Sequence, residues 1–250
     1  KIEMKKLLTK LLPLAFLGFA GAAISAPVTQ TINDNYWGAD AHGWGDIIGT
    51  PSIFDVNRLD VTTDGDSLKV KVFTKFQESS TAWYSNIKYG DLFISNNGWN
   101  PSGTAANHYI TDKFGNGEAW EYVFDTDVNK LYGGAFSIKT SDQEGVTGTF
   151  RNGQETRRKK GGTEVLSNTV VIAQEGGWNT LLYSFSFSAI GIDYTQGYDL
   201  GFKWNMTCGN DSIEGGISGG GVPPNEVPEP ASLGLLGMGL VGIAARRKKA

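Results

Sequence analysis

The sequence predicts an all-β protein in which two antiparallel sheets pack as a β-sandwich of jelly-roll or lectin-like type. Between about residues 31 and 207, short runs alternate apolar and polar side chains, the period of a strand with one buried face. Glycine, asparagine and aspartate separate the runs, and the chain has 34 glycines but only 8 prolines. No stretch of helical length keeps a 3.6-residue period. An up-and-down barrel is the alternative.

The first 26 residues have the three regions of a secretory signal peptide. Lys5, Lys6 and Lys10 precede an apolar run over 11–24, and small residues then place the cleavage site after Ser25 or Ala26. A membrane-anchoring helix is the alternative. The apolar run is short for that, because a spanning helix needs about 20 apolar residues.

The β domain is expected over residues 27–212. Its clearest element is a hairpin in which Asp64-Gly65-Asp66 joins two alternating runs, 58–63 and 68–76. Residues 186–192 could form one helical turn. Alternation in a later run places three aromatic side chains on one face, which we expect to be core: Tyr183, Phe185 and Phe187. The other predicted strands are 91–95, 119–124, 131–139, 147–151, 165–173, 179–188 and 200–207.

Beyond the domain we expect a linker and a tail. Residues 213–226 combine glycine with proline and hold little to bury, which predicts a linker. The tail, 227–250, begins with Val227, Pro228, Glu229 and Pro230, continues through uncharged residues 231–245, and ends in four basic residues, Arg246, Arg247, Lys248 and Lys249. A helix over 231–245 would reach about 22 Å, short of a hydrocarbon core of about 30 Å. It is a marginal hydrophobic helix with a basic membrane stop that stays in the cytoplasm.

The motif, the apolar helix and the basic stop, in that order, resemble the PEP-CTERM sorting signal of Gram-negative bacteria. The resemblance implies a transient stay in the inner membrane and processing near Pro-Glu-Pro by a membrane-embedded cysteine protease, an exosortase. It also implies delivery to the cell surface or to the exopolysaccharide matrix of a biofilm. The two prolines hold Glu229 in an extended backbone that a protease cleft can read. An ordinary single-span anchor is the alternative.

Segments inside the domain extend the resemblance. Residues 90–95 with 98–101, and residues 204–215, are similar to segments of a subset of exported PEP-CTERM proteins. No catalytic residue can be transferred from that subset.

The charge of the domain excludes one class of partner. Residues 26–245 hold 14 basic and 25 acidic side chains, a net charge of −11. Such a surface repels phosphate backbones, so we expect no nucleic-acid partner. The single cysteine, Cys208, cannot form an internal disulfide and is expected to be a buried thiol, with an intermolecular crosslink or a modification as alternatives.

Tryptophan is frequent, with seven in the chain. Four lie in loops rich in glycine, asparagine or aspartate, where their rings could stack on sugars: Trp37, Trp44, Trp83 and Trp99. Hydrogen bonds to the sugar would then come from Asp91, Asn97 and Asn100. Packing in the core is the alternative for these four, and it is the expectation for Trp120, Trp178 and Trp204.

A catalytic site is not expected. Glu118 and Glu121 flank Trp120, and a glycosidase needs two carboxylates beside a sugar-binding aromatic ring. In a strand, however, residues three apart face opposite sides, so the pair would not share a cleft without a bulge. The chain has only two histidines, His42 and His108, and no nucleophile or zinc motif.

No cofactor is expected, although a structural calcium ion is left open. Asp125, Asp127 and Asn129 alternate as in a calcium loop, but Lys130 and Phe136 stand where an EF-hand needs glycine and glutamate. A hairpin turn is the better interpretation. A calcium ion elsewhere could use oxygen atoms from these side chains: Asp34, Asp40, Asp46 or Asp91.

One basic run, Arg157 to Lys160, lies between glycines and predicts a solvated hairpin tip. Binding of an anionic polysaccharide is the alternative. Together these observations predict an exported, exosortase-sorted surface or matrix protein with a non-catalytic structural or carbohydrate-binding role. The alternative is an extracellular, glycosidase-like enzyme acting on glycans.

Overall fold

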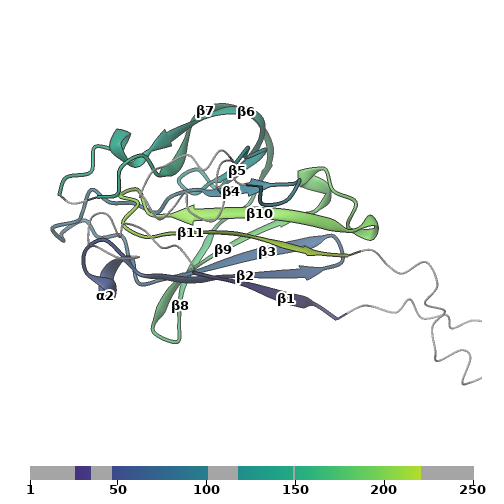
Figure 1. The fold of residues 1–250 in the computed structure, drawn as a ribbon, viewed down its shortest axis with the longest axis horizontal. Helices are drawn as coiled ribbons and strands as arrows, with labels where there is room; N and C mark the ends of the chain where they lie inside the picture. Colours follow the sequence, from purple (N-terminus) through teal and green to yellow (C-terminus); the bar gives the residue numbers. More distant parts are fainter. Residues whose placement is uncertain (1–25, 35–46, 101–117, 149, 221–250) are drawn as a thin grey trace, which may run out of the picture. The chain divides into compact units, whose positions relative to one another are not determined.

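A computed structural model describes residues 26–34, 47–100, 118–148 and 150–220 (Figure 1). The predicted sorting tail and all of the predicted signal peptide except its last residue, Ala26, lie outside these ranges. The described part is mostly β, with one short α-helix, α2 (Pro51–Phe54). The predictions of an all-β class and of antiparallel sheets are therefore confirmed. The jelly-roll or lectin-like connection of the strands stays a prediction.

The strands form two antiparallel sheets. A five-stranded sheet has the order β1-β2-β3-β9-β8, and a six-stranded sheet has the order β11-β10-β4-β5-β6-β7. The strands of the first sheet are β1 (Val28–Asn33), β2 (Val56–Asp64), β3 (Ser67–Thr74), β8 (Val171–Glu175) and β9 (Trp178–Ser186). Those of the second are β4 (Leu92–Ser95), β5 (Tyr122–Asp125), β6 (Lys130–Thr140), β7 (Glu155–Ser167), β10 (Tyr198–Asn205) and β11 (Ser212–Gly219). Three single 3₁₀ turns complete the list: η1 (Ser141–Gln143), η2 (Ser188–Ile190) and η3 (Tyr194–Gln196).

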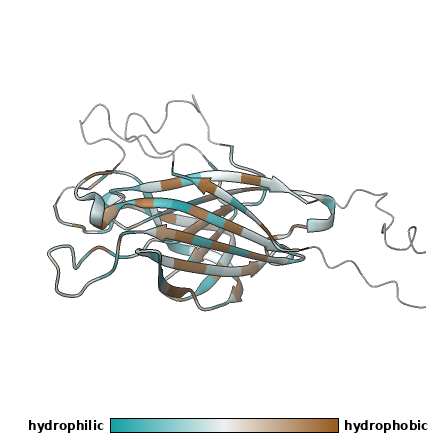
Figure 2. Cartoon of the chain, turned by 90° about the horizontal axis from the view of Figure 1, so that it is seen from below, coloured by the Kyte–Doolittle hydropathy of each residue, from teal (hydrophilic) through white to brown (hydrophobic). Residues whose placement is uncertain are grey.

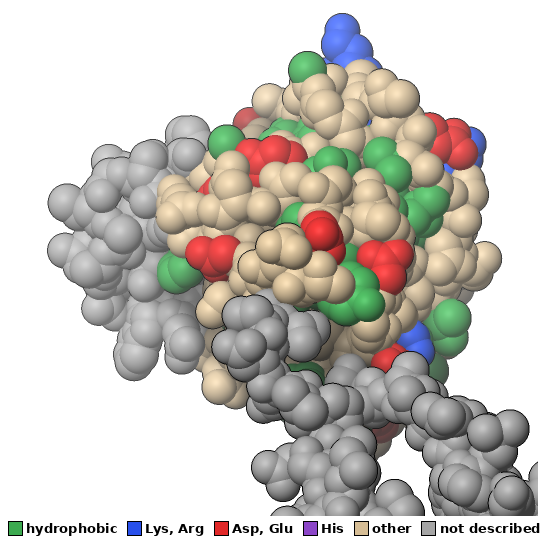
Figure 3. Space-filling view, turned by 90° about the vertical axis from the view of Figure 1, so that its right-hand side faces the viewer, with side chains coloured by type: hydrophobic (Ala, Val, Ile, Leu, Met, Phe, Trp, Pro, Cys, Tyr) green, Lys and Arg blue, Asp and Glu red, His purple; other side chains and the backbone are tan. Residues whose placement is uncertain are grey.

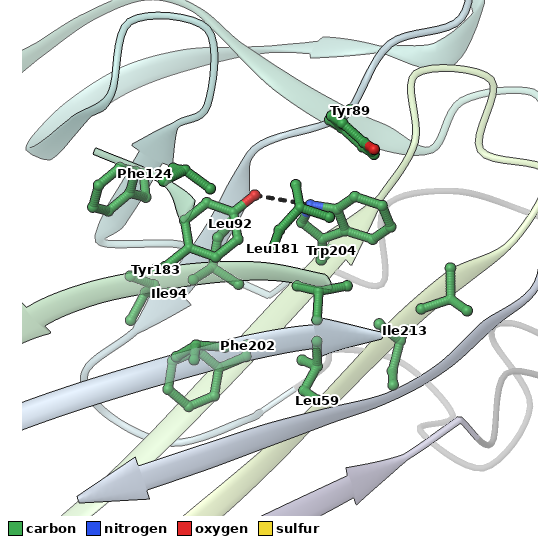
Figure 4. Packing of buried hydrophobic residues seen from close by; sticks show 14 of the residues in the cluster. Leu59, Tyr89, Leu92, Ile94, Phe124, Leu181, Tyr183, Phe202, Trp204 and Ile213 are labelled. Carbon is green, nitrogen blue, oxygen red and sulfur yellow. Dashed lines mark hydrogen bonds between the residues drawn. The ribbon is translucent and has the colours of Figure 1, made fainter. Parts of the chain in front are cut away.

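Both sheets contribute to one hydrophobic core. Apolar and polar residues alternate along several of the strands (Figure 2), and such a strand turns one apolar row inward. Leu59 of β2, Leu181 of β9 and Trp204 of β10 are fully buried in this core (Figure 4). Burying a side chain such as leucine contributes about 1.5–3 kcal/mol. The predicted aromatic core face is confirmed, because Tyr183, Phe185 and Phe187 all belong to this core.

The Asp64-Gly65-Asp66 hairpin is confirmed, since Asp64 pairs with Ser67 across Gly65 at φ +55°. The predicted helical turn over 186–192 is confirmed by η2. Between Asp125 and Lys130 the chain also forms a hairpin, as the departure from a calcium loop predicted.

Two strand predictions are wrong. Residues 147–151 form no strand in the described part of that range, and the N–H group of Arg151 instead donates to the carbonyl of Cys208 at 3.1 Å. The predicted strand 165–173 is divided between β7 and β8. The division occurs at residues that bond to Asn129. The N–H group of Asn168 donates to the backbone oxygen of Asn129, and the N–H group of Val170 donates to its Oδ1 atom.

The linker predicted for 213–226 is wrong over its first part, because Ser212–Gly219 forms β11. Ile213 and Ile217 are buried, and the glycines between them serve packing rather than flexibility. A Cβ atom on Gly215 would lie 2.7 Å from Cγ2 of Ile32, and one on Gly216 would lie 3.0 Å from Cβ of Trp99. Composition alone could not distinguish this close packing from a flexible segment.

Candidate functional site

Trp83 is the most exposed large hydrophobic side chain that the structure describes, with 68% of its surface accessible. Two aromatic rings hold it edge-on, Tyr84 at 5.2 Å and Phe54 at 6.0 Å between centroids. Phe54 is itself fully buried. The indole therefore rests on core residues while remaining open to solvent, which is the arrangement that a sugar-stacking ring requires.

The backbone before Trp83 is fixed locally. Oγ of Ser79 accepts hydrogen bonds from the N–H groups of Thr81 and Ala82, at 3.3 and 3.1 Å. Such side-chain-to-backbone hydrogen bonds are typical of serine in a turn. The sequence indicated Trp83, but gave no sign that Phe54, 29 positions earlier, would support it.

The other candidate tryptophans differ from Trp83. Trp37 and Trp44 lie outside the described residues. Trp99 is half-buried and packs against a small cluster of Phe93, Trp120 and Val123, separate from the main core. Its Nε1 atom is buried and has no hydrogen-bond partner among the residues that the structure describes.

The three tryptophans predicted to lie in the core differ in how deeply they are buried. Trp120 and Trp204 are buried, as predicted. The prediction for Trp178 is wrong, because its ring is only half-buried at the start of β9 and carries the Nζ atom of Lys75 at 3.8 Å from its centroid. A two-residue turn, Gly176-Gly177, leaves this strand end near the surface.

The carboxylates of Glu118 and Glu121 both hold the same loop. Glu118 accepts the N–H group of Asn100, while Glu121 accepts the N–H group of Asn96 at 3.2 Å and the amide of Asn97 at 3.1 Å. The premise of the sequence argument, that both lie in one strand, is wrong, because β5 begins only at Tyr122 and strand alternation does not apply before it.

The surroundings of Glu118 change the pKa of its carboxyl group. Burial raises the pKa of Glu118 above its ordinary value, and the neighbouring charge of Glu121 adds to the rise, against the hydrogen bond from Asn100. Trp120 lies between them in sequence, but its Nε1 atom donates to Glu155 at 3.0 Å. The arrangement combines a carboxyl of raised pKa with a second carboxylate, the two elements of acid–base chemistry on sugars.

The basic run does not form a hairpin tip, so that prediction is wrong. It lies within β7, and its two arginines are paired inside the domain. Arg157 donates to Glu144 at 2.9 Å and to Asp127 at 2.8 Å, and Arg158 donates to Asp125 at 2.9 Å. Glu144, which no sequence pattern singled out, is buried by this contact.

Only Lys159 and Lys160 of the run are exposed, and neither belongs to an ion pair among the described residues. Figure 3 shows that acidic side chains also gather on the end of the domain where β1 begins and β11 ends. An anionic polysaccharide would therefore meet two exposed lysines on a domain with an excess of acidic side chains.

The oxygen atoms considered for calcium have other partners or are not described. Asp91 is buried, and its carboxylate accepts the N–H groups of Thr126 at 2.9 Å and Arg158 at 2.7 Å. Burial raises the pKa of Asp91 well above its ordinary range, and the nearby Asp125 adds to this. Asp40 and Asp46 lie outside the described residues. Within the described ranges, no group of three or more histidine, cysteine, aspartate or glutamate side chains is placed to hold a metal.

The segment over 204–215 connects β10 to β11 and has a structural role. Asp211 accepts the N–H group of Val56 at 2.6 Å, and the carbonyl of Asn210 accepts that of Ile48 at 2.7 Å. Cys208 is buried here, as expected, and burial raises the pKa of its thiol to about 12. A thiol that stays protonated is a poor nucleophile.

Comparison with known proteins adds one finding, at the C-terminus. A family model described as the PEP-CTERM protein-sorting motif matches residues 226–248. No curated protein and no solved structure matches the chain significantly. In the part of the chain that the structure describes, no helix is long and apolar enough to cross a membrane, and residues 226–248 lie outside that part.

Proposed function

Because this chain is a PEP-CTERM domain-containing protein, we propose that an exosortase processes its tail and that the β domain then has a non-catalytic role at the cell surface. The motif match over residues 226–248 is the observation that supports export and sorting. The proposal further includes a signal peptide cleaved after Ser25 or Ala26, a brief stay in the inner membrane, and release into an exopolysaccharide matrix.

Only a short segment separates the end of β11 from the sorting motif. This strand ends at Gly219, and the motif match begins at residue 226. The residues between them can span at most about 20 Å, even fully extended. An exosortase acting near Pro-Glu-Pro would thus work close to the folded domain.

Replacing Glu229 tests the sorting proposal. In a host that contains the exosortase, Glu229→Ala should leave the unprocessed chain in the inner-membrane fraction, detected by immunoblot. Asn225→Ala, just outside the matched residues, is the control and should be released normally. Normal release of the Glu229 variant would contradict exosortase-type sorting.

For the domain itself we propose carbohydrate binding at Trp83, on a lectin-like sandwich. The support is the exposed indole held by Phe54 and Tyr84. Neutral glycans suit it better than anionic ones, because both arginines of the basic run are already paired with carboxylates. Binding of this kind needs no bound cofactor.

A glycan array with the released protein tests this role. Trp83→Ala should lose about tenfold or more in affinity, since stacking on an aromatic ring contributes about 1–3 kcal/mol in comparable ring-on-ring contacts. Trp178→Ala, which removes a half-buried ring elsewhere, should bind normally. Absence of binding by the unaltered protein, or equal binding by the Trp83 variant, would overturn the proposal.

The second candidate is a glycan-active enzyme that uses Glu118 and Glu121. The observation that favours it is that both carboxylates reach the same loop and that the pKa of Glu118 is raised. The released protein should then liberate reducing ends from a glycan, and Glu118→Gln should abolish this while Glu164→Gln, an exposed control, should not. No release by the unaltered protein across a glycan panel would favour the binding role.

A further inference from the structure

We propose that β8 is the edge through which two copies of this chain join, with their β8 strands antiparallel and Ala173 at the two-fold axis. β8 is an edge of the five-stranded sheet, and all five of its residues are exposed. Val171 and Ile172 are 53% and 54% exposed. The inference does not depend on the proposed function.

The apolar row on the core side of this sheet is left open at β8. Ile172 is paired with Leu181 of β9, which is paired with Val72 of β3. Leu181 and Val72 are completely buried, whereas more than half of Ile172 is accessible. One further strand beside β8 would cover Ile172 and complete the hydrogen bonding of this edge.

The backbone of β8 is also available for pairing. The N–H group of Val170, just before the strand, turns away from β9 and donates to Oδ1 of Asn129 at 2.8 Å. Residues two apart in a strand present their N–H and C=O groups to the same side, so those of Ile172 and Gln174 face outward. In the described part of the chain no strand pairs with that side.

The other sheet edges are covered or protected, which distinguishes β8 from them. The β7 edge carries Lys159 and Lys160 and several register shifts, features that oppose pairing with another chain. The β1 and β11 edges lie against each other, with Nε2 of Gln30 donating to the carbonyl of Ser218 at 3.1 Å. β8 has no proline, lysine or register shift.

A second copy suits this edge because the charges there are balanced. With Ala173 on the axis, Ile172 would lie opposite Gln174 of the other copy, and Val171 opposite Glu175. The charge of Glu175 is already paired with Lys71 at 2.8 Å, and Lys75 lies close by, bonded to the carbonyl of Gly177. No like charges would face each other, although the domain as a whole is strongly acidic.

Cysteine crosslinking of the full chain tests the proposal. Residues on the axis would form a non-hydrogen-bonded pair, with Cα atoms about 4.5 Å apart, which lies within the range for a disulfide. Ala173→Cys should therefore give a disulfide-linked dimer on a non-reducing gel under mild oxidation. Cys208 is buried and should not contribute.

Two variants make the result specific. Thr163→Cys places a thiol at another exposed position, on the β7 edge, and should remain largely monomeric. Adding Ile172→Lys to Ala173→Cys should lower the dimer yield about tenfold or more, because a lysine on an edge strand opposes pairing with another chain. A monomeric Ala173→Cys chain, equal crosslinking at Thr163→Cys, or crosslinking of Ala173→Cys to a different protein would each overturn the proposal.

Discussion

Nε1 of Trp204 donates a hydrogen bond of 3.1 Å to the hydroxyl of Tyr183, and the two residues belong to different sheets (Figure 4). Both side chains are fully buried. The tyrosine hydroxyl also lies 3.0 Å from Oγ1 of Thr126. This polar contact inside an apolar core sets the position of β9 relative to β10, because any shift would leave a buried donor without an acceptor.

Tyr183→Phe should lower the free energy of unfolding by about 1–3 kcal/mol, the cost of a buried donor left without its partner. Urea unfolding of the full chain, followed by tryptophan fluorescence, measures the change. Tyr132→Phe is the matched control, since its hydroxyl has no hydrogen-bond partner among the described residues. An equal loss in both variants would mean that the Trp204 contact is not the cause.

Asp91→Asn should also destabilise the domain, by about 1–3 kcal/mol. Each carboxylate oxygen of Asp91 accepts one backbone N–H group, from Thr126 and from Arg158. An asparagine keeps the shape but offers one acceptor, so its amide would face one of those N–H groups. Asp142→Asn, at an exposed position, provides the comparison. Unchanged urea midpoints would argue against this role of the carboxylate.

The stability of the domain should fall in acid through Glu144. Burial alone would raise its pKa, but hydrogen bonds from Arg157, Lys139 and Thr156 outweigh that effect and lower the pKa below its ordinary value. A carboxyl with a lowered folded pKa stabilises the fold above its unfolded pKa, and this contribution is lost as the pH falls through the folded value.

Glu144→Gln should therefore cost about 1–3 kcal/mol at pH 7, since Arg157 keeps Asp127 and some solvent as partners. The variant should also show a smaller loss of stability below about pH 4.5 than the unaltered chain. Urea unfolding at a series of pH values compares the two slopes. Parallel slopes would show that another group controls the acid response.

Ending the chain at residue 212 should prevent cooperative folding, whereas ending it at residue 222 should not. The shorter form lacks β11, whose Ile213 and Ile217 are buried in the core. Losing each of them removes about 1.5–3 kcal/mol of burial, besides exposing the edge of β10. Thermal unfolding by circular dichroism separates the two forms, and a cooperative transition in the shorter one would contradict the role of β11.

Much of the fold could be predicted because apolar and polar residues alternate along a strand that has one buried face. It identified β2, β3, β9 and β10 and the aromatic core face of Tyr183. It failed for β11, where glycines are required by Ile32 and Trp99 from distant parts of the chain. The prediction that Trp178 lies in the core also failed. The pattern of apolar and polar residues does not show that the strand end at Trp178 is open to solvent.

The candidate sites were harder to predict because their geometry depends on contacts between distant residues. The basic run suggested a solvated tip, but Glu144 and Asp125 bind its arginines across the sheet. Glu118 and Glu121 appeared to be separated by strand alternation, yet the strand starts after them. Trp83 could be nominated from its loop, while its support by Phe54 required the structure.

The contact between Gln30 and Ser218 joins residues 188 positions apart in the chain. The first strand of the domain therefore meets its neighbour β11 only when synthesis of the domain is nearly finished. Closure of the two edges is therefore a late step of folding, because a contact between residues so far apart costs more loop-closure entropy than a local one.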